Sequence, residues 1–289
     1  MSERPPVGHE VAGSDSARPA GDGGRAAGAP HAGMTSRASR PIPIVLAAAG
    51  SSHPDAGSAY AAMEEAVRAA CPGHDVRWAW TSAVARAARR ARGEAAPDLA
   101  EVLRGRRAAG ASRAVVQSLH VGPGEELDRL RNLREPGLDL RIGAPLLADD
   151  ESIASVAAVM EASLRAAAPN VLAAHGSARG PAFNDALRRL AEPIERRHPD
   201  AVLCTLEGAP GAAPLERIRD AARRAGRVHF VPLTFAAGTH VRRDFAGDGP
   251  DSWKSRLGVA EATVAPALGE RAEIRAIYLR HLAAALAAF

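Results

Sequence analysis

The chain carries one pattern of apolar runs twice, and this internal repeat constrains the fold more than any other feature of the sequence. The stretch IVLAAAGS at 44–51 resembles NVLAAHGS at 170–177, which aligns Gly50 with Gly176 at an offset of 126. Repeated supersecondary patterns at a fixed spacing indicate repeated architecture. We therefore predict that the chain folds as two similar halves.

Further apolar runs strengthen the repeat. The run at 76–80 keeps the offset of 126 with the run at 202–206, and a third pair follows at the shorter offset of 114, with Gly124 opposite Gly238. Stretches rich in Ala, Leu and Arg with helical spacing separate the runs, and one helix is expected over about 59–70. Alternating strands and helices predict an α/β fold in which each half is a parallel sheet flanked by helices. The predicted strands are 42–49, 76–80, 113–119, 171–174, 202–206 and 228–233.

Composition agrees with two halves of domain size. The chain has 289 residues with 46% hydrophobic content, which is enough to build sizeable cores, while aromatic residues make up only 3%. Residues 1–40 are rich in Gly, Ala, Pro, Ser and Arg and have no apolar periodicity, so they cannot bury enough surface to offset the entropy of ordering. We predict a disordered tail at 1–40, an N-terminal half at 41–148 and a C-terminal half at 149–289.

The sequence also limits the location and the partners. It lacks the roughly 18 consecutive apolar residues of a membrane span and the apolar core of a secretory signal, so we expect a cytoplasmic protein with no membrane partner. Cys71 and Cys204 are too few for a disulfide framework. A net charge of +4 permits an acidic ligand, but no basic stripe with interleaved aromatic residues indicates nucleic acid. We interpret the arginines within 86–92 as a solvated helix face.

Comparison of the strand ends in the two halves points to a metal site. Ligands of α/β sheets bind at the carboxyl ends of strands. There the C-terminal half carries two His and one Glu where the N-terminal half has Ala, Thr and Glu. Imidazole and carboxylate groups suit a divalent transition ion and leave coordination positions open. A lone His is more often a capping or core residue, but three such residues at equivalent strand ends favour a metal site. The aligned pairs are Ala49 with His175, Thr81 with Glu207, and Glu126 with His240.

A second candidate region is the stretch DSWK at 251–254, which follows a Gly- and Asp-rich loop. It is typical of a helix N-terminus, with Asp251 or Ser252 as the cap and Trp253 packing beneath, and we favour Asp251. Alternatively the loop is a mobile rim whose basic residues meet substrate carboxylates. The sequence does not decide between these roles for Arg242, Arg243 and Lys254.

Together these motifs resemble the anaerobic sirohydrochlorin cobaltochelatase family of cobalamin biosynthesis, within the class II chelatases. The resemblance runs from about Ile42 to the C-terminus. It rests on segments that occur in this order: GSSHP at 50–54, VQSLH at 116–120, GEE at 124–126, AHGS at 174–177, LEG at 206–208, PL at 232–233, AGTH at 237–240, Asp244 with AGD at 246–248, DSWK at 251–254 and LGE at 268–270.

The resemblance implies a fold and an activity. It implies two α/β halves facing each other across a cleft, and a lyase that inserts a divalent metal, most often Co²⁺, into a sirohydrochlorin-type tetrapyrrole. The metal is a substrate, and no organic cofactor is implied. The resemblance also implies metal ligands His175, Glu207 and His240 and a catalytic acid/base role for Glu126. We further predict catalytic roles for His175 and His240. The predicted substrate-binding residues are Gly50, Ser51, Ser52, His120, Arg242, Arg243 and Lys254.

Other functions share these residues. An iron or nickel chelatase would use the same ligands, and a metal or tetrapyrrole carrier could use the same scaffold. Retention of Glu126 favours catalysis, since a carrier needs no proton acceptor opposite the metal. The two imidazoles can hold the metal or accept pyrrole protons, because an unperturbed imidazole has a pKa near ~6.5. A homo-oligomer is compatible with the sequence, which does not define the oligomeric state.

Overall fold

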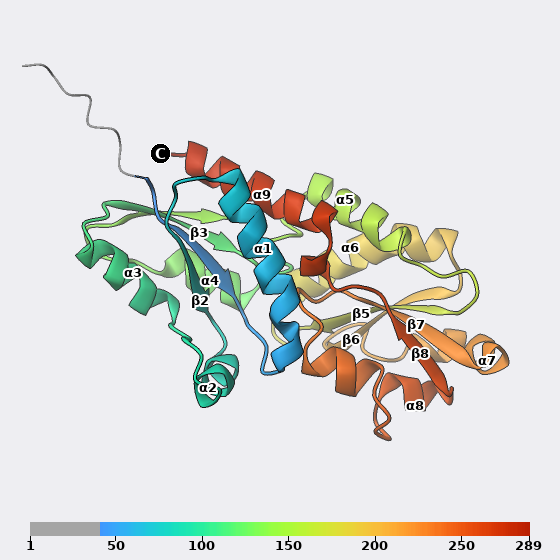
Figure 1. Cartoon of the computed structure of the whole chain (residues 1–289). Helices are drawn as coiled ribbons and strands as arrows, with labels where there is room; N and C mark the ends of the chain where they lie inside the picture. The colour runs from blue at the N-terminus through green and yellow to red at the C-terminus, as the bar shows by residue number, and fades with distance from the viewer. Residues whose placement is uncertain (1–40) are drawn as a thin grey trace, which may run out of the picture. The chain divides into compact units, whose positions relative to one another are not determined.

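The computed structural model describes residues 41–289, which form one unit; the predicted tail at 1–40 lies outside the described residues. Within that unit the chain forms two four-stranded parallel sheets with strand orders β2-β1-β3-β4 and β6-β5-β7-β8 (Figure 1). The predicted α/β fold of two similar halves is confirmed. The strands are β1 (Ile44–Ala48), β2 (Val76–Trp80), β3 (Arg113–Ser118), β4 (Asp139–Gly143), β5 (Asn170–Gly176), β6 (Ala201–Glu207), β7 (Arg227–Pro232) and β8 (Glu261–Val264).

Helices cover both faces of each sheet, which explains why the strands are continuous apolar runs. They are α1 (Gly57–Ala70), α2 (Ala83–Ala91), α3 (Leu99–Ala108), α4 (Glu125–Asn132), α5 (Asp150–Glu161), α6 (Pro181–Arg197), α7 (Leu215–Ala225), α8 (Trp253–Leu257) and α9 (Ala272–Ala287), with the short helices η1 (Pro54–Ala56), η2 (His240–Phe245) and η3 (Leu268–Glu270).

The central strand of the first sheet shows how alternation builds two cores. Every residue of β1 is buried. Ile44 and Leu46 belong to the large core that includes Met63 of α1, whereas Val45 belongs to a second core that includes Leu103 of α3. Successive side chains of a strand point to opposite faces, so a strand buried on both sides must be apolar throughout.

The second sheet repeats this arrangement. Leu172 of β5 packs in the large core with residues of α6 such as Leu190. Val171 packs on the other face with Ile218 of α7 and Trp253 of α8. The repeat seen in the sequence is therefore a repeat of the same packing.

The last helix joins the two halves. Helix α9 packs against β3 and β4 of the first sheet, although it follows the second sheet in the chain (Figure 1). The buried Tyr278 hydroxyl donates to the carbonyl oxygens of Leu119 and His120, at 3.2 Å each. Side chains of the C-terminal half therefore pack against the N-terminal half. The division between residues 148 and 149 stays a prediction.

Two local predictions were wrong. The cap of α8 is Ser252, whose hydroxyl accepts from the Ser255 N–H at 3.1 Å, while Asp251 is exposed one position too early. The arginines of α2 are more than a solvated face. Arg86 donates to the carbonyl oxygens of Trp80, the last residue of β2, and of Thr81, which follows it. The guanidinium of Arg89 lies 4.1 Å from the centroid of the Trp80 ring, so these two arginines contact the end of the strand.

Along residues 41–289, every helix is too short or too polar to cross a membrane.

Candidate metal site

Three neighbouring strands of the second sheet carry the predicted ligands to one edge. His175 is the penultimate residue of β5, Glu207 is the last residue of β6, and His240 opens η2 after β7. β5 lies between β6 and β7, and Gly176 is in register with Glu207. Parallel strands end at the same edge of a sheet, so the fold collects these residues at the carboxyl ends of the strands.

The two predicted imidazoles contact each other. The ring centroids of His175 and His240 lie 4.7 Å apart with an interplanar angle of 74°. The His240 side chain is 44% exposed, so solvent and a ligand can reach it. The repeat therefore predicted a real spatial pair from residues that are 65 positions apart in the sequence.

Hydrogen bonds determine which nitrogen each ring can offer. The Nδ1 atom of His175 lies 3.1 Å from the Gly176 carbonyl oxygen, and the Nδ1 atom of His240 lies 2.7 Å from Oδ2 of Asp244. A carbonyl and a carboxylate only accept, so Nδ1 carries the proton in both neutral rings. The lone pair is then on Nε2 in each ring, so each of the two neighbouring rings can offer Nε2 to a cation.

Asp244 is ionised and held on two sides. Burial acts to raise the pKa of Asp244, but its hydrogen bonds to Arg243 and His240 and the charge of Arg243 outweigh burial, so the pKa lies below its ordinary value. The guanidinium of Arg243, predicted to meet substrate, donates from Nε to Oδ1 at 2.7 Å. Arg243 is thereby engaged with Asp244.

The third predicted ligand is not assembled with the other two. Glu207 is exposed at the end of β6. Along residues 41–289, no group of three or more His, Cys, Asp or Glu side chains is arranged to hold a metal ion. The imidazole pair is preformed, and a carboxylate ligand from Glu207 requires rotation of an exposed side chain.

Two glycines allow the strand ends to lie this close. Gly176 has φ +71° and Gly208 has φ +70°, a region that favours glycine. A Cβ on Gly176 would lie 2.1 Å from the carbonyl oxygen of Glu207. The loop that follows Gly176 is held in place because the Asn184 side chain of α6 accepts from the Ser177 N–H at 2.9 Å and donates to the Ser177 carbonyl oxygen at 2.7 Å.

The equivalent edge of the first sheet holds a different set of polar groups. His120 bonds through Nδ1 to the Ser118 hydroxyl at 2.9 Å and through Nε2 to the Thr81 hydroxyl at 3.3 Å. Burial lowers the pKa of His120, and the charge of Glu126 opposes that shift only in part. Glu126 on α4 is 39% exposed and pairs with Arg129 at 2.8 Å. This edge therefore offers a neutral imidazole and an accessible carboxylate.

The predicted substrate loop of the first half touches the loop that carries His240 in the second. The Ser52 and Thr239 hydroxyls are 3.1 Å apart, and Thr239 directly precedes His240. A Cβ on Gly238 would lie 2.6 Å from Oγ of Ser51. The first of these loop residues, Gly50, has φ +86°.

The remaining predicted substrate-binding residues are basic; Arg242 lies in η2 and Lys254 lies in α8. Lys254 pairs with Asp248 at 2.5 Å, with its side chain 17% exposed. Arg242 is exposed next to Arg243.

Sequence reasoning missed the Asp244 contact with His240, although the spacing of four residues within a helical turn could have indicated it.

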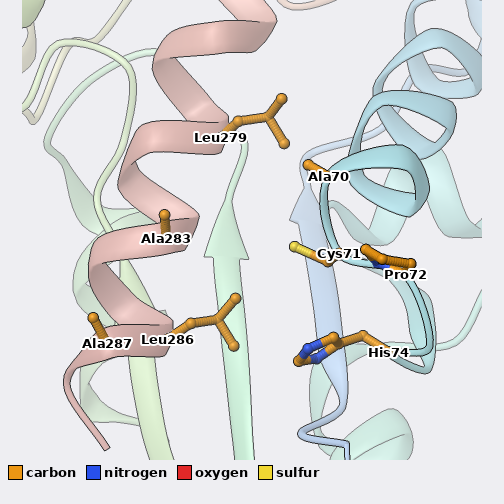
Figure 2. A pocket seen from close by; sticks show the side chains of 8 residues that line it. All are labelled: Ala70, Cys71, Pro72, His74, Leu279, Ala283, Leu286 and Ala287. Carbon is orange, nitrogen blue, oxygen red and sulfur yellow. The ribbon is translucent and has the colours of Figure 1, made fainter. Parts of the chain in front are cut away.

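A hollow of about 520 Å³ lies elsewhere, between the end of α1 and α9, where Leu279 and Leu286 face Cys71 and His74 (Figure 2). None of the residues that line it was predicted to be part of the site.

Comparison with known proteins decides the family. The sequence model of the cobalt chelatase family, CbiK, matches residues 43–287. The chain belongs to this family. The sirohydrochlorin cobaltochelatase CbiKC of Nitratidesulfovibrio vulgaris (strain Hildenborough) is 32% identical over 260 residues, which are 85% of this chain and 90% of that protein. The sirohydrochlorin cobaltochelatase of Salmonella typhimurium is 30% identical over 78% of this chain and 88% of that protein.

Solved chelatase structures share the fold of this cobalt chelatase. SirB from Bacillus subtilis with Fe³⁺ superposes with a TM-score of 0.56 at 15% identity, covering 84% of this chain and 94% of that one. CbiX, described as the terminal enzyme of siroheme biosynthesis in denitrifying bacteria, superposes with a TM-score of 0.51 at 23% identity, covering 84% and 99%. The predicted chelatase-like architecture and the predicted family are confirmed.

Proposed function

We propose that this cobalt chelatase inserts Co²⁺ into sirohydrochlorin, and that His175, His240 and Glu207 bind the incoming ion. The observation that carries the proposal is the preformed imidazole pair, whose ring centroids lie 4.7 Å apart. Each ring uses Nδ1 for its hydrogen bond to the protein, which leaves Nε2 to bind the ion. The substrate assignment draws on the relatives, two of which are named sirohydrochlorin cobaltochelatase.

The donor set suits transient binding of a metal substrate. Two imidazole nitrogens and one carboxylate oxygen bind divalent transition ions at about 2.0–2.2 Å and leave positions open. Pyrrole nitrogens can enter those positions while the protein ligands leave in turn. An exposed, rotatable Glu207 fits this role, because a ligand that can swing toward the ion can also swing away.

Insertion also requires removal of two pyrrole protons. We assign one acceptor role to Glu126, whose carboxylate is accessible at the edge of the first sheet. His120 beside it stays neutral at neutral pH because burial lowers its pKa. Once the metal has left them, His175 and His240 can accept the other proton. Exchange of two protons for one divalent cation keeps the charge balanced.

Binding of the macrocycle is assigned to the loops that rim this edge. Gly50, Ser51 and Ser52 supply backbone and hydroxyl groups beside the loop that carries His240, and Arg242 and Lys254 supply positive charge for substrate carboxylates. The reaction changes no oxidation state, so the proposal involves no organic cofactor. We also propose that the reaction takes place in the cytoplasm.

The test is anaerobic insertion of Co²⁺ into sirohydrochlorin, followed by absorbance. We expect the wild-type chain to exceed the uncatalysed rate, and Glu126→Gln to bind Co²⁺ normally but to lose turnover by about 10²–10⁴-fold. Arg196→Gln, which breaks an ion pair with Glu192 on α6, is the matched control and should keep full activity.

Parallel reactions with Fe²⁺ and Ni²⁺ test the metal assignment. Faster insertion of either ion than of Co²⁺ would contradict it. Rates equal to the uncatalysed reaction with all three ions, from folded protein that still binds Co²⁺, would refute the enzyme and favour a carrier.

A further inference from the structure

A hydrogen-bonded chain of three side chains lies beside the candidate ligands. It runs from Arg243 through Asp244 to His240, all within η2. Oδ2 of Asp244 lies 2.7 Å from Nδ1 of His240, and Oδ1 lies 2.7 Å from Nε of Arg243. The second guanidinium contact, from Nη2 of Arg243 to Oδ2, is longer at 3.3 Å.

The geometry of this chain differs from that of a surface ion pair. Arg243 approaches both oxygens of Asp244 and so holds the plane of the carboxylate, with Oδ2 facing the imidazole. The Asp244 side chain is 22% exposed, whereas that of Arg243 is 70% exposed. The carboxylate is thus the inner member, placed between a solvated cation and a candidate ligand.

The two imidazoles are oriented by different means. His175 is part of a strand, and its Nδ1 atom faces a backbone carbonyl whose position the strand determines. His240 lies on a short helix, is 44% exposed and has a side-chain carboxylate as its Nδ1 partner. Without that carboxylate, nothing in the contacts of Nδ1 would keep the proton there rather than on Nε2.

We propose that Asp244 is a positioning residue that keeps His240 in the tautomer protonated at Nδ1, so that Nε2 is the nitrogen that binds Co²⁺, and that Arg243 orients Asp244. The identity of the ion in this inference rests on the proposed function. The tautomer of His240 is a property of the metal-free protein and is independent of that function. Arg243 then acts through Asp244, and Arg242 and Lys254 remain the residues for substrate carboxylates.

The first measurement is the tautomer itself. Long-range ¹H–¹⁵N correlation spectra of ¹⁵N-histidine-labelled, metal-free protein distinguish Nδ1–H from Nε2–H, at a pH where the imidazole is neutral. We expect His240 to be protonated at Nδ1 in the wild-type chain and to shift toward Nε2–H in Asp244→Ala. His175 should keep its tautomer in both proteins and is the internal control.

The second measurement is Co²⁺ affinity by titration of the visible absorption. Loss of a hydrogen-bonding partner behind a histidine ligand weakens metal binding by about 10–100-fold, which is the increase in Kd expected for Asp244→Ala. Asp244→Asn keeps an oxygen acceptor without the charge, so its increase should be smaller. The increase in Kd for Arg243→Gln should be smaller still. Glu192→Gln, which removes the carboxylate of an exposed ion pair on α6, should leave Kd unchanged.

Different results would refute the two proposals. An unchanged His240 tautomer in folded Asp244→Ala, or an Asp244→Ala affinity equal to that of Glu192→Gln, would overturn the positioning role. If Asp244→Ala does not fold, the near-isosteric Asp244→Asn and Arg243→Gln decide the question by the same spectra. A wild-type chain that fails to bind Co²⁺ would overturn the proposed function, while the tautomer measurement would still decide the role of Asp244.

Discussion

Gly176 offers a sharp test of how the backbone shapes the edge of the second sheet that carries His175. It follows His175, has φ +71°, and a Cβ placed on it would lie 2.1 Å from the carbonyl oxygen of Glu207 and 2.8 Å from Cβ of Thr205. The carbonyl belongs to the backbone of β6, so the overlap cannot be relieved by rotating a side chain. Gly176→Ala must therefore separate the ends of β5 and β6.

The expected magnitude has two parts. A residue with a Cβ in the left-handed region costs roughly 1–2 kcal/mol. Overpacking of a close contact typically adds about 1–3 kcal/mol, so Gly176→Ala should destabilise the chain by about 2–5 kcal/mol. Gly226 provides the matched control, because it has φ +68° in the same half and nothing within 4 Å of its added Cβ. Gly226→Ala should show only the first part, roughly 1–2 kcal/mol.

Urea unfolding followed by far-ultraviolet circular dichroism measures both free energies. The difference between the two variants isolates the steric contact. Equal destabilisation by Gly176→Ala and Gly226→Ala would refute the close approach of β5 and β6 described above. Since Gly176 adjoins His175, Gly176→Ala should also weaken Co²⁺ binding, whereas Gly226→Ala should not.

Three further predictions concern the rest of the molecule. Tyr278→Phe removes the hydroxyl that bonds to two carbonyls at 3.2 Å, and urea unfolding should show a loss of about 0.5–1.5 kcal/mol; no loss would contradict the bridge from α9 to the first sheet. Hydrogen bonds from Arg197 and the adjacent imidazole lower the pKa of Glu161 to about 2, so its contribution to stability is present above its ordinary pKa and lost as the pH falls toward 2. Glu161→Gln should accordingly destabilise the chain at pH 6 and have a vanishing effect near pH 2 by urea unfolding, and an effect that persists there would refute this assignment. Burial raises the pKa of Cys204 to about 12, so a thiol reagent at pH 8 should modify Cys71 but not Cys204 in the native chain; mass spectrometry of the digested protein reads the outcome, and rapid labelling of Cys204 would contradict its burial.

The fold, and the proximity of the candidate ligands, could be predicted because both depend on strand periodicity. A strand covered on both faces must be apolar, so the runs beginning at Ile44 and Asn170 reveal the strands and their repeat. The carboxyl ends of adjacent parallel strands must meet, so His175 and His240 could be paired without a structure. Topology brings the two segments to the same edge, and the structure shows that the rings are in contact.

Details that depend on side-chain rotation or on packing between halves were beyond this reasoning. The choice between Asp251 and Ser252 as the α8 cap depends on a one-residue difference in where the helix begins. Glu207 is exposed, so backbone position does not determine where its carboxylate points. The packing of α9 on the first sheet depends on contacts such as Tyr278 with Leu119, which are 159 residues apart and leave no periodic signal.

We expect the second sheet, not the first, to bind the metal substrate. Anomalous diffraction at the cobalt edge, from crystals of the wild-type chain exposed to Co²⁺ without macrocycle, tests it most directly. We predict one strong peak about 2.0–2.2 Å from Nε2 of both His175 and His240, with the Glu207 carboxylate turned toward it. A peak at His120 and Glu126 instead, or no peak at the imidazole pair in crystals that bind Co²⁺ elsewhere, would contradict the assignment of the metal to the second sheet.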